Sequence, residues 1–403
     1  MEKKPPIGFS GAAAKIRAAV DGQRLLDTAV ALVEVPSPTR DAGEVADRLA
    51  ELLTEDGFQV ERPVADWPKA PAVAVRLQGR SPGKVLQFDG HLDTVHLPFV
   101  PPRVAGGKLY GSGSSDMKGG IAACVEALRV LRDTECLAAG GVLLTAHDHH
   151  EAPWGDRRQV RALIADGYVG DAVLLPEYLA GHLPVAGRGM GIFEVTISRE
   201  GEPVHEVLRP ENQPNVIDAG AELVVLLRQL DVSLGAVTSP HAGRDSVFVG
   251  KVQAGEIYNQ SPTQCTVHGT RRWVTPGGVE AARSGLDQLF REVAESSETT
   301  LEWEFEVPGD AFRIDPEDPV VAAFQRACRQ IAGAELPLGG KPFVDDGNVY
   351  STLAGIPALT HGPDATGAHT LEEAVPVAEL VRVAQVYALT AVAYGPGESG
   401  TIS

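Results

Sequence analysis

Histidine and carboxylate side chains are concentrated in one short segment of the 403-residue chain, residues 147–151, which read HDHHE. The segment directly follows residues 141–145, an apolar run typical of a buried strand. Imidazole and carboxylate groups are the usual protein ligands of zinc and related ions, so this composition favours a metal site. A polar surface loop is the alternative interpretation of the same residues.

A histidine and an aspartate at the end of another apolar run form a second candidate. His91 and Asp93 follow residues 84–88, and because they are two positions apart they share a face where the chain stays extended. A neutral imidazole can bind a metal ion while a carboxylate holds its other ring nitrogen. Alone, the pair also fits a hydrogen-bonded loop histidine.

Three further candidates stand singly in the sequence. Asp116 lies in the glycine-rich segment 111–120, where glycine lets the backbone bend tightly around a crowded site. That segment lacks the GxxxxGK[ST] spacing of a phosphate loop, and a glycine turn with a capping aspartate is its simpler interpretation. Glu177 follows a buried run, and His369 lies in a second glycine-rich loop, residues 362–373. Each of these two also fits a structural role when taken alone.

The elements that position these residues follow an alternating pattern. Apolar runs and helical spacing take turns along the first part of the chain. The predicted strands cover residues 72–77, 84–88, 141–145 and 171–175, and the predicted helices cover 12–35, 42–56, 120–131 and 158–166. Buried strands that alternate with helices indicate a layered α/β sheet.

Around Gly191 the pattern changes to a smaller α+β unit. Its predicted order is strand 192–198, helix 215–229, strands 246–252 and 264–274, helix 278–296 and strand 300–305. This order is close to a ferredoxin-like fold. After Pro308 the α/β pattern returns, with helices at about 319–332 and 375–394. We therefore expect a discontinuous larger domain, residues 1–190 and 308–403, interrupted by an inserted domain, residues 191–307.

Taken in order, the separate motifs resemble the signature of one family. The motifs are GHLDTV, GSGSSDMKGG, the acidic segment after the next strand, the strand that ends in Glu177, and GPDATGAHTLEE. The set is similar to that of the metallopeptidases that include aminoacylases, acetylornithine deacetylases, succinyl-diaminopimelate desuccinylases and glutamate carboxypeptidases. The resemblance covers nearly the whole chain. It implies a three-layer zinc-peptidase-like catalytic domain with an inserted ferredoxin-like lid and dimerisation domain.

The resemblance also implies two zinc ions per subunit, with cobalt or manganese as alternatives. The ligands would be Asp116 bridging both ions, His91 and Glu177 on one ion, and Glu151 and His369 on the other. Asp93 would orient His91. Two such ions polarise a carbonyl and lower the pKa of a bridging water, which suits amide hydrolysis near neutral pH.

The chain departs from the family at the general base. The family carries two adjacent glutamates there, the first as base and the second as metal ligand, whereas this chain has His150-Glu151. With Glu151 as the ligand, His150 takes the place of the base, a role open to imidazole because its pKa lies near neutrality. In the other register Glu151 is the base and Ala152 occupies the ligand position, which loses a ligand. His147 and His149 are close enough to substitute or to add a ligand.

The inserted domain also carries residues that match the family. His205, followed ten residues later by Asn215, resembles the lid histidine that reaches into the partner subunit's active site and donates to the oxyanion. Asn259 matches a lid asparagine near the substrate, and Arg272 matches a strand arginine that binds a substrate carboxylate. An exposed histidine and a surface arginine are the alternatives. The resemblance thus implies a homodimer formed through the lid.

Composition limits the other classes of function. Acidic residues outnumber basic ones by 54 to 35, for a formal charge of -19, which argues against nucleic acid and anionic membrane surfaces as partners. The four cysteines are scattered and are typical of reduced core residues. No apolar run approaches the roughly 20 residues of a membrane span, and the first residues lack the apolar run of a signal peptide. We therefore expect a cytoplasmic protein.

Together these features predict a metal-dependent hydrolase of the amide bond in an N-acyl amino acid or a short dipeptide-like substrate. The sequence does not distinguish a deacylase from a dipeptidase, because the pockets that determine specificity lie on loops that carry no recognisable motif. The alternative function is a non-catalytic metal-binding or ligand-binding homologue that has lost turnover together with the usual glutamate base.

Overall fold

The computed structural model describes residues 8–397, and its chain divides into two compact units. Unit 1 contains the described residues up to Val185 together with Ile314–Gly339 and those from Asp345 onward. Unit 2 contains Ala186–Arg313 and Gly340–Val344. The boundaries expected from the sequence lay after residues 190 and 307. Residues 340–344, which the sequence analysis placed in the larger domain, belong to unit 2, and the boundary at this point falls within strand β18.

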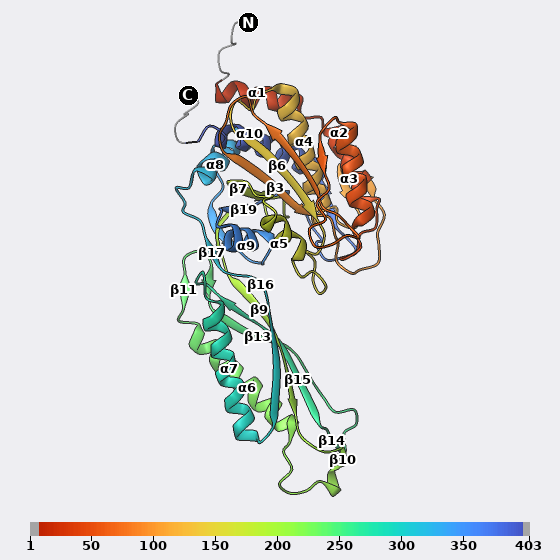
Figure 1. The fold of residues 1–403 in the computed structure, drawn as a ribbon, viewed down its shortest axis with the longest axis vertical. Helices are drawn as coiled ribbons and strands as arrows, with labels where there is room; N and C mark the ends of the chain where they lie inside the picture. Colours follow the sequence, from red (N-terminus) through yellow and green to blue (C-terminus); the bar gives the residue numbers. More distant parts are fainter. Residues whose placement is uncertain (1–7, 398–403) are drawn as a thin grey trace. The chain divides into compact units, whose positions relative to one another are not determined.

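Unit 1 is built on a six-stranded sheet with the order β1-β2-β6-β3-β7-β19 (Figure 1). Its strands are β1 (Val60–Glu61), β2 (Val73–Gln78), β3 (Val85–His91), β6 (Gly141–His147), β7 (Ala172–Leu175) and β19 (Ala358–Thr360). Strands β6, β3, β7 and β19 run parallel, whereas β1 and β2 are antiparallel to their neighbours. The parallel strands therefore end at one common edge of the sheet.

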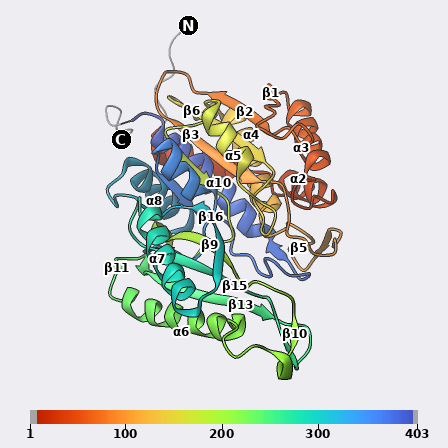
Figure 2. The same cartoon turned by 60° about the horizontal axis from the view of Figure 1, so that its bottom comes forward.

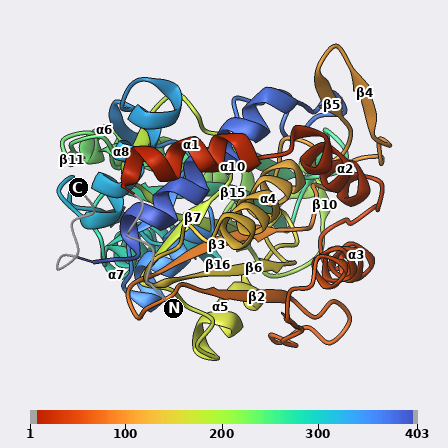
Figure 3. The same ribbon diagram turned by 90° about the horizontal axis from the view of Figure 1, so that it is seen from above.

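Helices cover both faces of this sheet, as Figure 3 shows for α4 and α10 on one side and α5 on the other. The helices are α1 (Phe9–Ala19), α2 (Gly22–Val33), α3 (Gly43–Glu55), α4 (Lys118–Thr134), α5 (Arg158–Ala165), α8 (Pro319–Ala332), α9 (Asp346–Val349) and α10 (Val377–Tyr394). A π-helical turn, η2 (Tyr350–Ala354), continues α9. Alternate strand residues face opposite layers: the ring of Phe88 packs on Tyr387 of α10, whereas Val173 clusters with Val160 of α5 and Val349 of α9. Unit 1 therefore has three layers.

The single helix expected over residues 12–35 is two helices, α1 and α2. The side chain of Asp21 accepts hydrogen bonds from the backbone N–H groups of Gln23 and Arg24, which caps the start of α2. The N–H of Asp21 itself donates to Glu126 Oε1 of α4 at 2.8 Å. Apolar residues keep their helical spacing across the break, so periodicity alone does not reveal it.

Helix α10 belongs to the core of unit 1. Among the residues that the structure describes, it is the helix with the length and apolar composition needed to cross a membrane. However, 61% of its length is buried inside the protein, and the core helices of soluble proteins meet the same criteria. It packs against α4 and α8.

A small antiparallel sheet brings two loops of the candidate site together. It has the order β20-β5-β4, with β4 (Arg103–Ala105), β5 (Lys108–Tyr110) and β20 (Ala374–Pro376). Just before β20, Glu373 Oε2 accepts from the backbone N–H groups of Gly113 and Ser115, at 2.9 and 3.3 Å. These contacts fix the loop of His369 next to the loop of Asp116.

Unit 2 has the ferredoxin-like order of strands and helices. Its elements are β9 (Gly189–Ser198), α6 (Val216–Leu234), β13 (Ser246–Ala254), β15 (Gln264–Trp273), α7 (Val279–Ser297) and β16 (Thr300–Gly309). The strands form an antiparallel sheet with the order β13-β15-β9-β16. Both the layered α/β unit and this α+β unit agree with the fold class predicted from the sequence.

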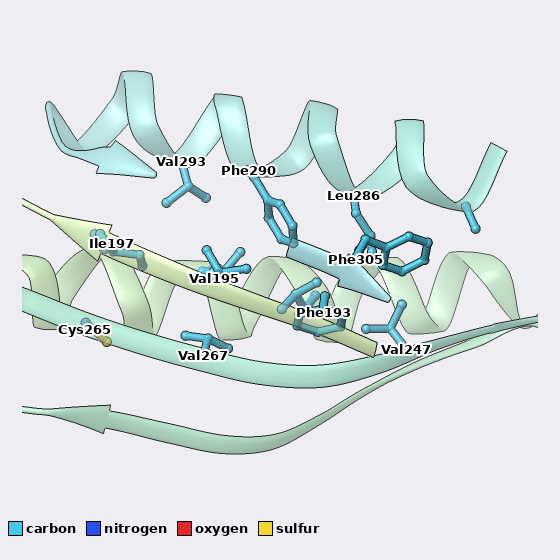
Figure 4. Packing of buried hydrophobic residues seen from close by; sticks show 14 of the residues in the cluster. Phe193, Val195, Ile197, Val247, Cys265, Val267, Leu286, Phe290, Val293 and Phe305 are labelled. Carbon is cyan, nitrogen blue, oxygen red and sulfur yellow. The ribbon is translucent and has the colours of Figure 1, made fainter. Parts of the chain in front are cut away.

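The core of unit 2 lies between its sheet and its two helices (Figure 4). Alternate residues of β9, among them Phe193 and Ile197, are fully buried, and Phe290 of α7 packs against this face. Short elements complete the chain: β8 (Leu183–Gly187), β10 (Val204–His205), η1 (Glu206–Leu208), β11 (Thr238–Ser239), β12 (Gly243–Arg244), β14 (Gln260–Ser261), β17 (Phe312–Arg313) and β18 (Leu338–Lys341).

Candidate metal centre

The predicted metal ligands of unit 1 gather where its parallel strands end. His91 is the last residue of β3, Glu151 follows β6 after a short loop, and Glu177 follows β7. Asp116 lies just before α4, and His369 lies in the loop that leads to β20. Because parallel strands end at one edge of a sheet, three chain segments deliver their side chains to the same place.

The carboxylate of Asp116 lies between two imidazoles. Its Oδ1 is 3.2 Å from Nε2 of His91, and its Oδ2 is 3.1 Å from Nε2 of His369. The same nitrogen of His369 is 3.3 Å from Glu151 Oε2. Asp116 thus directs its two oxygens at two separate groups, which is the arrangement of a bridging carboxylate.

Two sets of ligand atoms share His91 in this region. His91, Asp116 and Glu151 each offer an atom within 4.8 Å of the others, and so do His91, His150 and Glu177. These five residues are buried, whereas 52% of the His369 side chain is exposed. All five ligands proposed from the sequence therefore lie together, with His150 among them and one side open to solvent.

The electrostatics of the cluster favour bound cations. Burial, and next the charge of Asp116, raises the pKa of Glu177 well above its usual range. Burial also opposes the charge on Asp116, but hydrogen bonds from His369 and His91 hold its pKa below the usual range. Hydrogen bonds to Asp116 and then Glu151 raise the pKa of His369 to about 10. Two imidazoles and three carboxylates form a donor set that suits zinc and other divalent ions.

Asp93 supports the site through both its backbone and its side chain. Nδ1 of His91 lies 2.9 Å from the backbone oxygen of Asp93 and 3.7 Å from its carboxylate. The carboxylate instead accepts from the backbone N–H of Glu151 at 2.8 Å and from that of His150 at 3.1 Å. Asp93 therefore orients His91 through its carbonyl and holds the loop of Glu151 through its side chain.

His150 faces the ligands with one ring nitrogen. Its ring stacks on His91, with centroids 3.8 Å apart and planes within 11°. Its Nε2 lies 3.8 Å from Glu177 Oε1, and its Nδ1 lies 2.6 Å from Asp346 Oδ2. Burial, followed by the charge of Arg157, lowers the pKa of His150, so the neutral imidazole is favoured.

The two neighbouring histidines point elsewhere. His149 Nδ1 contacts Asp156 at 3.1 Å, and its ring meets the edge of Trp67. His147 Nε2 lies 3.3 Å from Asp89 Oδ2 and 3.6 Å from Asp346 Oδ2. Neither belongs to a set of ligand atoms that contains His91.

Asp89, His147 and Asp346 form a second buried set of possible ligand atoms. Burial lowers the pKa of His147, but the charge of Asp89 outweighs it and raises the value to about 9. A protonated imidazole between two carboxylates therefore explains these contacts. Asp89 and Asp346 were not singled out by the sequence analysis. Two adjacent aspartates directly before a glycine, at residues 345–347, are the local pattern that could have indicated a functional turn at Asp346.

The residues proposed for substrate binding lie in unit 2. Nε2 of His205 is 3.1 Å from Nδ2 of Asn259, so the two residues that matched lid positions meet in space. Asn215 caps α6, where its side chain accepts from the backbone N–H of Ile217. Arg272 is half-buried, and its Nη1 has no hydrogen-bond partner among the described residues. Its neighbour on β15, residue 271, is instead buried in an ion pair with Asp245 at 2.7 Å.

A layered α/β unit, a ferredoxin-like unit and these candidate ligands are the features expected of a metal-dependent hydrolase. The chain belongs to peptidase family M20/M25/M40, whose profile matches residues 88–393. This finding confirms the family resemblance drawn from the motifs and favours the enzyme over the non-catalytic homologue.

Similar proteins of known name support this assignment. The chain is 27% identical, over 379 residues, to a succinyl-diaminopimelate desuccinylase of Gluconacetobacter diazotrophicus, covering 89% of this chain and 93% of that protein. Its fold is similar to that of the aminopeptidase PepT from Bacillus cereus, with a TM-score of 0.79, 21% identity and coverage of 93% and 99%. It also resembles the YXEP protein of Bacillus subtilis, a dinuclear metal-binding peptidase, with a TM-score of 0.69, 18% identity and coverage of 92% and 97%.

Proposed function

We propose that this chain is a two-zinc amidohydrolase that cleaves the amide bond of an N-acyl amino acid or a short dipeptide-like substrate. The observation that carries the proposal is the convergence of two histidines and three carboxylates at one edge of the sheet, with a further imidazole facing them. The similar proteins named above include a desuccinylase and an aminopeptidase, which are hydrolases of this general class.

In this proposal Asp116 would be the ligand common to both ions. His91 and Glu177 would hold one of them, and Glu151 and His369 would hold the other. Cobalt and manganese are compatible with the same donors. Zinc bound there would polarise the scissile carbonyl and lower the pKa of a water molecule.

His150 is the proposed general base. Its Nε2 accepts the proton of the attacking water and later returns a proton to the leaving amine. The buried, neutral imidazole supports this role, because a neutral ring has a free lone pair. Since Nε2 also lies 3.8 Å from Glu177 Oε1, service as an additional metal ligand is the competing role. Metal content of a His150 variant separates the two.

Unit 2 is the proposed source of substrate contacts. The Nη1 of Arg272, half-buried and without a hydrogen-bond partner among the described residues, is suited to a substrate carboxylate. Asn259 is the proposed second contact to substrate. In this scheme His205 donates to the oxyanion of the active site in the partner subunit.

A homodimer formed through unit 2 is proposed from the open edge of its sheet and the exposed apolar residues of α6. Strand β13 is an edge strand, and Figure 2 shows it beside α6. Exposed apolar side chains stand at helical spacing on α6, namely Ile217, Val225 and Val232. Phe248 of β13 is also exposed, but on the opposite face of the sheet, because its neighbour Val247 packs in the core with α6. An open edge strand beside an apolar helix face favours pairing with the same surface of a second copy.

A substrate screen tests the proposed function. Purified protein is assayed against N-acetyl, N-succinyl and N-carbamoyl amino acids and against dipeptides. We expect hydrolysis of at least one class, its loss on treatment with a chelator, and its return with zinc. Activity that survives complete metal removal would contradict the proposal. The cytoplasmic location expected from the sequence stays a prediction.

A further inference from the structure

A row of buried polar side chains continues from the metal centre along the face of the sheet that α5 and α9 cover. Asp89 of β3 accepts hydrogen bonds from the hydroxyls of Thr145 and Tyr350, at 2.5 and 3.0 Å. Its other oxygen lies 3.3 Å from Nε2 of His147, which in turn lies 3.6 Å from Asp346 Oδ2. Asp346 therefore stands between this row and the metal centre.

Asp346 contacts the metal centre through His150. Asp346 is the first residue of α9, 196 positions along the chain from His150, and both side chains are buried. Asp346 Oδ2 lies 2.6 Å from Nδ1 of His150, and Arg157 Nε lies 3.5 Å from Oδ1. Arg157 and the protonated ring of His147 lie 3.5 and 3.6 Å from the Asp346 carboxylate, and their positive charge favours an ionised Asp346, which can accept but not donate a hydrogen bond. The proton of the shared bond therefore belongs to Nδ1 of His150.

This contact, together with the stacked ring of His91, defines the orientation of His150. The stacking sets the plane of the ring, and the bond to Asp346 sets its rotation within that plane. With the proton on Nδ1, the lone pair of a neutral ring is on Nε2, the nitrogen that faces Glu177. Both a general base and a metal ligand need their lone pair at that atom.

We propose that Asp346 is the positioning residue of His150: it selects the tautomer with the proton on Nδ1 and directs Nε2 at the metal centre. The proposal rests on the proposed function only in giving His150 a role in turnover. A similar carboxylate–histidine pair orients the base of serine proteases, where an amide in place of the carboxylate favours the wrong tautomer and lowers turnover by about 10⁴-fold.

A nearby pair provides a matched control. His149 Nδ1 also contacts a carboxylate, that of Asp156, at 3.1 Å. Its Nε2, however, is buried without a hydrogen-bond partner among the described residues and does not join the ligand sets around His91. Asp156→Asn therefore changes the same chemical bond on the adjacent histidine without touching the metal centre.

The direct test is the tautomer of His150, measured by nitrogen-15 NMR of the zinc-loaded full chain labelled at histidine. Loss of one set of ring signals in His150→Gln assigns the residue. We expect the proton on Nδ1 in the wild-type protein and a change of these signals in Asp346→Asn, with no change in Asp156→Asn. A proton on Nε2 in the wild-type protein would overturn the proposal, even if the variant failed to fold.

Turnover provides the second readout. We expect Asp346→Asn to lower kcat by at least about 100-fold with KM changed less than about threefold, the pattern of a lost transition-state interaction. In a His150→Ala background the same substitution should change kcat by less than about threefold, because the two residues act as a unit. If Asp346→Asn lowers kcat by the same factor in the His150→Ala background as in the wild-type protein, the two residues act independently and the proposal is overturned. If no substrate is hydrolysed at all, the proposed function fails, while the NMR measurement still decides the role of Asp346.

Discussion

At the scale of single residues, the feature that the sequence analysis singles out is an imidazole, His150, at the place where the resemblance expects a glutamate. His150 is buried against His91, and its Nε2 faces the ligands. A neutral histidine ring offers one lone pair, whereas a carboxylate offers about four. The orientation of the ring must therefore be held more closely than that of a carboxylate. The contact with Asp346 supplies that constraint.

Removal of the His150 imidazole should separate its two candidate roles. We expect His150→Ala to lower kcat by roughly two to four orders of magnitude, the usual span for lost acid–base catalysis, while both metals stay bound. Glu151→Ala should lose one metal instead. Kinetics and elemental analysis of the same preparations check both statements, with His149→Ala as the control. If His150→Ala loses metal while Glu151→Ala retains both ions, the roles of general base and metal ligand are exchanged between the two residues.

A buried histidine away from the metal ligands should control acid stability. Burial, and then the charge of Arg382, lowers the pKa of His361 to about 3, whereas a histidine in an unfolded chain titrates near 6.5. Between these values the unfolded chain binds more protons, so stability is lost as pH falls from about 6.5 towards 3. This group alone contributes a slope of up to about 1.4 kcal/mol per pH unit.

The corresponding measurement is urea unfolding of the metal-free protein between pH 6.5 and 4.5. We expect the stability of His361→Leu to fall less steeply with acid than that of the wild-type protein. His241→Asn, a substitution at an exposed histidine of unit 2, is the control and should keep the wild-type slope. Equal slopes in all three proteins would contradict the prediction.

At the scale of elements, the site depends on how closely α4 approaches the segment after β7. A Cβ on Gly120 of α4 would lie 2.3 Å from the backbone oxygen of Pro176, the residue before Glu177. Backbone cannot yield as a flexible side chain does, so Gly120→Ala should separate α4, and Asp116 before it, from Glu177. Overpacking of this kind costs about 1–3 kcal/mol. We expect lower thermal stability and weaker zinc binding, measured by calorimetry.

Gly285→Ala is the matched control for that substitution. Gly285 lies within α7 of unit 2, where a Cβ would meet no atom within 4 Å. Alanine there should raise stability by about 0.4–1 kcal/mol, because it restricts the unfolded chain. Zinc binding at wild-type strength in Gly120→Ala would show that this close approach does not position the ligands.

The same elements show how far the sequence predicts the structure. Apolar runs followed by His, Asp or Glu predicted β3, β6 and β7, because strand periodicity is a local signal. The same runs placed the candidate ligands at the strand ends, because ligand chemistry is also visible residue by residue. The break between α1 and α2 was missed, since the capping by Asp21 competes with an unbroken apolar pattern. Strands β4, β5 and β20 are three residues long, too short for periodicity to indicate.

The partner of His150 could not be predicted for a different reason. Asp346 lies 196 positions away in the chain, and only the packing of α9 on the sheet brings the two together. A pair of this kind is a property of the tertiary structure, because neither residue carries a local pattern that names the other. Asp89, the partner of His147, could not be predicted for the same reason, because it lies within a strand that is otherwise largely apolar.

At the scale of the whole molecule, the proposed dimer makes the active site a shared property of two chains. We expect a mixture of His205→Ala and Asp116→Ala proteins, each inactive alone, to regain activity on subunit exchange. Half of the dimers are mixed and each has one complete site, so about a quarter of all sites should work. Each variant exchanged with itself is the control. No recovery despite proven exchange would exclude action of His205 in the partner's site.

Anomalous X-ray diffraction from crystals of the zinc-loaded protein can decide whether this chain binds two ions between its named ligands. We expect two peaks at the zinc absorption edge, both beside Asp116, one shared with His91 and Glu177 and the other with Glu151 and His369. No peak at this edge of the sheet, or a single peak among Asp89, His147 and Asp346, would contradict this expectation.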